Sequence, residues 1–129
     1  MLDRRAAEVE LLKKKYSRVD AAAQCEWVIV HSVPLSPGWN RAETDVLLIL
    51  SGAYPETAPD NFYVPAGLRL QGGGVPGSMT PGSFSHQGQT WDTFSWHIEN
   101  GWSPSSDVKA GSNLLGVMRE VERRLSEAN

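Results

Sequence analysis

The sequence has a single cysteine, Cys25, among its 129 residues. One cysteine cannot form an internal disulfide bond, and this favours a reducing, cytoplasmic compartment. Its place between a predicted helix and a predicted strand favours a small buried side chain over a reactive thiol. The three histidines and this cysteine lack the spacing of a zinc site, so no metal ligand is predicted.

Other missing features exclude further classes of function. Gly72-Gly73-Gly74 is not followed by Lys-Ser or Lys-Thr, which predicts a flexible turn instead of a phosphate-binding loop, and no cofactor is expected. The net charge of −3 argues against nucleic acid as a partner. No apolar run has the length of a membrane span or the character of a signal peptide, so no membrane partner is expected. The length and the 40% hydrophobic content predict one domain over residues 1–129.

Basic residues are concentrated near the N-terminus, where the first eighteen residues hold half of the twelve. These residues are Arg4, Arg5, Lys13, Lys14, Lys15 and Arg18. Such charges on a helix usually form a solvated face, and the alternative is a docking surface for an acidic protein. Both interpretations remain open at this point.

Hydrophobic spacing predicts a helix, a short meander and a long loop. Apolar residues at steps of three and four indicate a helix over about residues 2–22. Alternation from Glu26 to Val33 indicates a strand, in which Val33 shares a face with Trp27 and His31 is a packed sheet residue. An apolar run over 44–50 predicts an antiparallel neighbour, and a third strand is expected near 62–64. Residues 65–90 have no sustained period, which predicts an irregular, functional loop.

The C-terminal part is regular again. Six apolar residues predict an amphipathic helix, with Ser105, Ser106 or Asp107 as its N-cap. The six are Val108, Leu114, Val117, Met118, Val121 and Leu125. The predicted fold class is therefore α+β, with two helices packed on an antiparallel meander of about three strands.

The segment from Trp91 to Asp107, WDTFSWHIENGWSPSSD, is the most distinctive part of the chain. It holds three of the five tryptophans, one of the three histidines and several hydroxyl groups. A serine close to a histidine is a candidate nucleophile with its base. The segment has no thiol of its own.

Two proline motifs carry a resemblance to a known family. Tyr54-Pro55 followed by Pro59-Asp60 resembles the Tyr-Pro…Pro-Pro turn of ubiquitin-conjugating enzymes, and Trp102-Ser103-Pro104 resembles the Trp-Ser-Pro that follows their active-site loop. Further matching residues occur in the same order: Pro34, Pro37-Gly38, Phe62, Trp91, Phe94-Ser95, His97 and Asp107. Over residues 1–127 the chain resembles that superfamily, and within it the prokaryotic ubiquitin-conjugating-like family E. The resemblance implies its fold, and a structural packing role is expected for Tyr54, Pro55, Pro59, Asp60, Trp91 and Trp102.

The chain departs from the superfamily at the position of the nucleophile. The resemblance implies a cysteine about eight residues before Trp102, and Phe94 and Ser95 stand there. We therefore expect Ser95 to carry the acyl group as an oxyester, with His97 as its base.

Further residues are candidates for supporting this chemistry. In an extended segment Ser95, His97 and Glu99 share one face, and Glu99 or Asp92 could orient the imidazole. Gln87 could donate to an oxyanion in place of the family's missing Asn. The alternative is that Ser95 only forms hydrogen bonds and His97 packs between tryptophans.

The resemblance implies two protein partners and a pathway. A ubiquitin-like protein would arrive from an activating enzyme, which would dock on the basic N-terminal helix at Lys13, Lys14 and Lys15. A bacterial conjugation pathway, with a role in antiphage defence, is the implied context. The alternative is a catalytically inactive binding module that positions either partner. A free-standing Ser/His esterase is a third interpretation, but the chain lacks a G-x-S-x-G nucleophile elbow.

Overall fold

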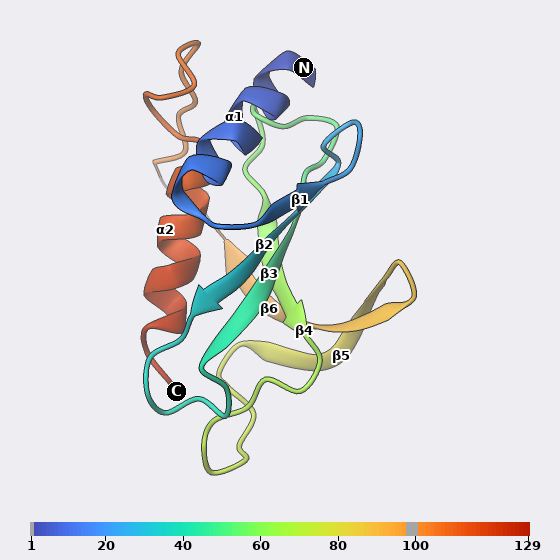
Figure 1. Ribbon diagram of the computed structural model, residues 1–129, viewed down its shortest axis with the longest axis vertical. Coiled ribbons are helices and arrows are strands. Elements are labelled where there is room, and N and C mark those ends of the chain that lie inside the picture. The colour runs from blue at the N-terminus through green and yellow to red at the C-terminus, as the bar shows by residue number, and fades with distance from the viewer. Residues whose placement is uncertain (1, 98–100) are drawn as a thin grey trace.

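The computed structural model describes residues 2–97 and 101–129, in which two helices cover one face of an antiparallel sheet (Figure 1). Within these residues the sheet has six strands in the order β1-β2-β3-β4-β6-β5. The elements in chain order are α1 (Leu2–Lys15), β1 (Val19–Ala21), β2 (Trp27–Pro34), β3 (Glu43–Ile49), β4 (Asp60–Pro65), β5 (Met79–His86), β6 (Gln89–His97) and α2 (Leu114–Leu125). The predicted α+β class is confirmed, with twice the predicted number of strands.

The main core lies between the sheet and the two helices. Val28 and Val30 of β2 are fully buried there, as are Leu12 of α1 and Met118 of α2. Each such side chain contributes about 1.5–3 kcal/mol through removal from water. Neither described helix is long and apolar enough to cross a membrane.

The first helix is shorter than its apolar spacing predicts. Val19 continues the helical spacing, but it lies in β1 and pairs with Val30 of β2. The pairing satisfies backbone groups that would otherwise remain open at the edge of β2. A second difference concerns Val33, which was predicted to share a face with Trp27. Val33 is instead buried in the main core, because a bulge around Ser32 shifts the β2–β3 register.

The predicted loop over 65–90 is wrong in its second part, where β5 and the start of β6 form a hairpin. Gln87 and Gly88 have φ angles of 49° and 78°, as a two-residue type I′ turn requires, and they connect the paired residues His86 and Gln89. Most side chains of β5 are exposed, so the strand lacks the alternation that would reveal it. The active-site loop expected around Ser95 is therefore a strand.

The C-terminal helix begins later than predicted. The side chain of Asn113 accepts a hydrogen bond from Gly116 N at 2.9 Å and caps α2, in place of the predicted Ser105, Ser106 or Asp107. The preceding loop turns back on itself, with Pro104 bridged to Gly111. Gly111 has a φ of 66°, and a Cβ there would lie 2.6 Å from the Ser103 carbonyl oxygen, so the turn requires glycine.

Candidate functional site

The Tyr54–Asp60 turn and Trp102 lie in contact at one end of the sheet. The Tyr54–Pro55 peptide bond is cis, and the indole Nε1 of Trp102 donates to the Pro55 carbonyl at 2.8 Å. The rings of Tyr54 and Trp102 have centroids 6.0 Å apart. Two motifs that are separate in the sequence therefore form one structural unit.

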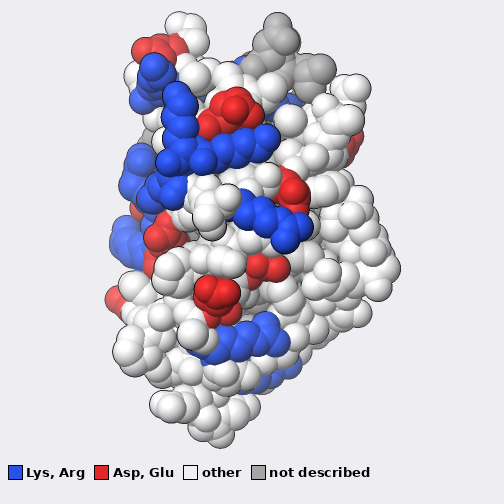
Figure 2. Space-filling model, in the orientation of Figure 1, with Lys and Arg blue, Asp and Glu red and all other residues white. Residues whose placement is uncertain are grey.

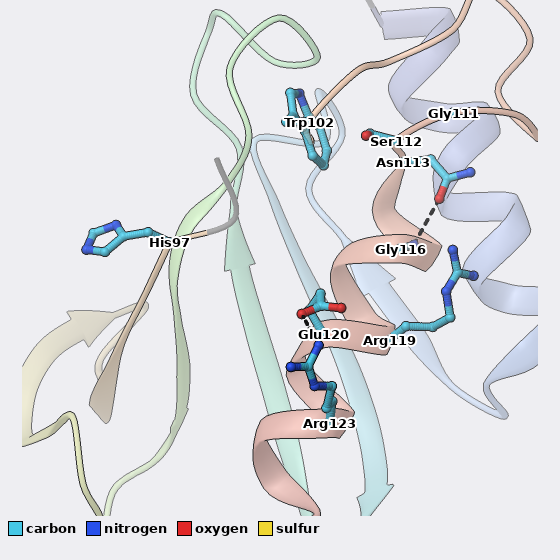
Figure 3. A pocket seen from close by; sticks show the side chains of 9 residues that line it. All are labelled: His97, Trp102, Gly111, Ser112, Asn113, Gly116, Arg119, Glu120 and Arg123. Atoms are coloured by element: carbon cyan, nitrogen blue, oxygen red, sulfur yellow. Dashed lines mark hydrogen bonds and ion pairs between the residues drawn. The ribbon is translucent and has the colours of Figure 1, made fainter. Parts of the chain in front are cut away.

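His97 and Asp60 form a hydrogen-bonded pair beside this unit. They are opposite one another in the β4–β6 register, and His97 Nδ1 lies 2.5 Å from Asp60 Oδ1. Both side chains are exposed, at 61% and 63%. Because Asp60 holds Nδ1, the other nitrogen, Nε2, is the one available for proton transfer. The imidazole points away from α2 (Figure 3).

Ser95 lies two residues before His97 and is exposed. Its neighbours Phe94 and Trp96 pack against the main core. Its amide donates to Ser78 O at 2.8 Å. In the described part of the chain no hydrogen bond joins Ser95 to His97.

A β-bulge interrupts β6 at Ser95. Asp60 pairs with His97 and Phe62 pairs with Phe94, so two residues of β6 stand opposite Asn61 alone. Asn61 has a φ of 63°, and its side-chain oxygen accepts from Trp96 N at 3.2 Å. Bulges bend a strand and redirect its side chains, and they occur often beside active sites.

Asp92 does not orient His97, contrary to the prediction. Its carboxylate is fully buried and accepts from Arg69 Nη1 at 2.9 Å, from Gly67 N at 2.9 Å and from Gly82 N at 2.7 Å. Asp60 is the carboxylate that is hydrogen-bonded to His97, although its sequence motif indicated only packing. The sequence did not indicate this contact because it depends on the pairing of β4 with β6. Glu99, the other candidate, lies outside the described residues.

Gln87 does not lie near Ser95, so its predicted oxyanion role is wrong. It occupies the hairpin turn at the opposite end of β6. Ser95 lies six positions after Gln89, which corresponds to about 20 Å along a strand. Trp91 is also distant from the pair: it is buried with Leu47 and Tyr63 in a second cluster on the sheet.

Two pockets lie on either side of Trp102. The larger, of about 490 Å³, lies between the loop before α2 and α2 itself, with Ser112, Arg119 and Arg123 in its lining (Figure 3). The smaller, of about 380 Å³, is lined by Glu56 to Asp60 and by Trp102. His97 lines the larger pocket and Asp60 lines the smaller one, so the hydrogen-bonded pair lies between the two. Among the described residues, no cluster of three His, Cys, Asp or Glu side chains could hold a metal ion.

The predicted docking residues are exposed at the end of α1. Lys13 lies 3.3 Å from Glu10, and Lys15 lies 3.6 Å from Glu122 of α2. Figure 2 shows that most of the visible Lys and Arg lie on the helix side of the molecule, whereas the side of β5 has few charges.

A family model agrees with the motifs and the fold. The model described as prokaryotic E2 family E matches residues 5–128. The chain belongs to this family. No curated protein and no solved structure matches it. Membership supports a ubiquitin-conjugating-like role, with interaction with a ubiquitin-like protein and an activating enzyme.

The only thiol of this family member is badly placed for carrying an acyl group. Cys25 is 6% exposed and lies at the junction before β2, where Arg5 donates to its carbonyl oxygen at 3.4 Å. A carrier must be reached by two proteins in turn, and a buried thiol is inert. The burial of Cys25 therefore argues against it as the acyl carrier.

Proposed function

We propose that the chain accepts the C-terminus of a ubiquitin-like protein from an activating enzyme and carries it as an oxyester on Ser95. The observation that supports this proposal is the exposed His97–Asp60 pair, with 2.5 Å between Nδ1 and Oδ1, two residues from Ser95. Asp60 keeps the imidazole in the tautomer whose Nε2 can accept a proton. A serine hydroxyl needs such a base because it is almost wholly protonated at neutral pH.

The proposed step is an acyl transfer. Ser95 Oγ attacks the activated C-terminal carbonyl, and the hydroxyl proton passes to His97 Nε2. The new Oγ–C bond forms, the bond to the activating enzyme breaks, and His97 returns the proton to the leaving group. The attack requires Ser95 and His97 to come closer together. The bulge opposite Asn61 supports such an approach, because the β4–β6 ladder is already interrupted there.

The oxyester has a chemical consequence for the pathway. It is a weaker acyl donor to amines than a thioester, so the acceptor must be well positioned, or the ester is itself the end product. We place this activity in a cytoplasmic bacterial conjugation pathway with a role in antiphage defence. This part of the proposal is supported by family membership alone.

The test is adduct formation with the cognate activating enzyme, the ubiquitin-like protein and ATP. An adduct that survives thiol reductant and is cleaved by mild base is expected, and Ser95→Ala should abolish it. Thr93→Ala is the matched control, because Thr93 lies on β6 like Ser95, and its Oγ1 is hydrogen-bonded to Ser83 Oγ of β5 at 2.6 Å. An adduct that persists in Ser95→Ala would assign the carrier to another group. An adduct that is cleaved by thiol reductant would indicate a thioester, and Cys25 would then be the candidate carrier.

A binding module is the second candidate function. It is favoured by the buried Cys25 and by the lack of a hydrogen bond between Ser95 and His97 in the described residues. Such a module would bind the ubiquitin-like protein without any adduct, and His97→Ala would leave that affinity unchanged. Calorimetric titration of wild type and His97→Ala with the ubiquitin-like protein, together with the adduct assay, separates the two functions: binding without any adduct indicates the module.

A further inference from the structure

Glu8 of α1 is a fully buried carboxylate that the proposed acyl transfer does not use. Three donors surround it: Arg4 Nε at 2.8 Å, the Tyr54 hydroxyl at 2.5 Å and Leu114 N at 2.7 Å. A buried charge is tolerated only with such partners. The three donors belong to α1, to the turn after β3 and to the first residue of α2. Glu8 therefore joins three segments that are distant in sequence.

Arg4 extends this connection to the loop that precedes α2. Its guanidinium donates to the carbonyl of Ser105 and, at 3.3 Å, to that of Ser112. Ser112 lines the larger pocket, and the turn that begins at Tyr54 lines the smaller one. The Arg4–Glu8 pair is thus hydrogen-bonded to a segment that lines each pocket.

The turn connects Glu8 to the candidate base. Tyr54 is fixed by Glu8 at the start of the turn, and Thr57 N donates to Ala53 O at 3.1 Å within it. The turn ends at Asp60, which holds His97. Burial, and then the hydrogen bond to Glu8, raise the pKa of Tyr54 far above its ordinary value, so the hydroxyl remains a donor at any working pH.

We propose that Glu8 is a positioning residue for the site: through Tyr54 it sets the place of Asp60, and through Asp60 the orientation of His97. Its importance for conjugation rests on the proposed function, whereas its effect on His97 does not. Loss of the Tyr54 hydroxyl frees the start of the turn, and the Asp60 carboxylate no longer meets Nδ1 in a fixed geometry.

The test compares Tyr54→Phe with Tyr16→Phe. Tyr16 also donates its hydroxyl to a glutamate, Glu122, but at the other end of α1, so the chemical change is the same and the turn is untouched. The readout is the rate at which diethyl pyrocarbonate modifies each of the three histidines, resolved by peptide mapping. His97 should react several-fold more slowly in Tyr54→Phe, because Asp60 no longer supports the nucleophilicity of Nε2, while His31 and His86 keep their rates. Tyr16→Phe should leave all three rates unchanged.

Glu8→Gln is the second variant, because the amide keeps an oxygen acceptor but loses the charge that strengthens the Tyr54 bond. The same selective decrease at His97 is expected, and smaller. An unchanged His97 modification rate in both variants would overturn the proposal. An equal change at all three histidines would overturn it too, because it indicates a general loosening of the fold. In the conjugation assay, equal adduct rates for wild type and folded Tyr54→Phe, together with the selective decrease at His97, would overturn the role of His97 as base and leave the positioning of His97 standing. No adduct in wild type, with a selective change at His97, would instead overturn only the acyl-carrier function.

Discussion

His97 and Asp60 meet across two neighbouring strands, with His97 Nδ1 2.5 Å from Asp60 Oδ1 although they are 37 positions apart in the chain. The pair is exposed on both sides, so it contributes at most about 1 kcal/mol to the free energy of unfolding. A contact that adds so little to the free energy of unfolding, and that has a fixed geometry, is suited to orienting a base. Its role can therefore be tested without loss of the fold.

Asp60→Asn should reduce the rate of adduct formation roughly a hundredfold, because the amide no longer holds the proton-accepting tautomer of His97. The free energy of unfolding should change by less than about 1 kcal/mol, measured by urea denaturation. A variant that unfolds readily but keeps its conjugation rate would contradict the orienting role.

Asp92→Asn should give the opposite pattern. Its carboxylate is fully buried against Arg69 and two backbone amides, so the change leaves Arg69 without its charge partner. A loss of about 3 kcal/mol in the free energy of unfolding is expected by urea denaturation. His97 reactivity in the fraction that remains folded should be unchanged, and a selective decrease there would restore Asp92 as a candidate for orienting His97.

The Asp20–His31 pair makes stability depend on pH. The hydrogen bond from His31, at 2.8 Å, lowers the pKa of Asp20 below its ordinary value. Because the folded pKa is the lower one, the carboxylate stabilises the fold above about pH 3.9, and this contribution is lost as the pH falls through the folded value. Asp20→Asn should therefore destabilise the chain at neutral pH, by less than about 1 kcal/mol because Asp20 is half-exposed. Urea unfolding between neutral pH and about pH 3 should show this difference shrinking, and a constant difference would contradict it.

Reversal of charge at Lys13, Lys14 and Lys15 should weaken binding of the activating enzyme at least about tenfold, with a smaller dependence on salt. The fold should lose about 1 kcal/mol, because basic residues in the last turn of α1 favour the helix dipole. Lys109→Glu, an exposed change in the loop before α2, is the control and should leave affinity unchanged. Equal affinities measured by surface plasmon resonance would refute the docking role.

Hydrophobic spacing in the sequence was informative where elements have one buried face. β2 and α2 follow most of their predicted residues because one face of each meets the main core, and β3 follows its predicted apolar run because both of its faces are buried. Spacing failed for β1, where Val19 fits both a helix and a strand, and only the open edge of β2 decides between them. It failed for β5 because an exposed edge strand has no buried face to mark it.

The sequence by itself determined the α+β class and the family, because buried faces and the two proline motifs are local features of the chain. The candidate nucleophile and base were also visible as neighbours, Ser95 and His97. Only the tertiary structure decided that Asp60, and not Asp92, holds His97. The reason is that partners across a sheet are set by the register of strands that are remote in sequence, and a shift of one residue would place a different side chain opposite His97.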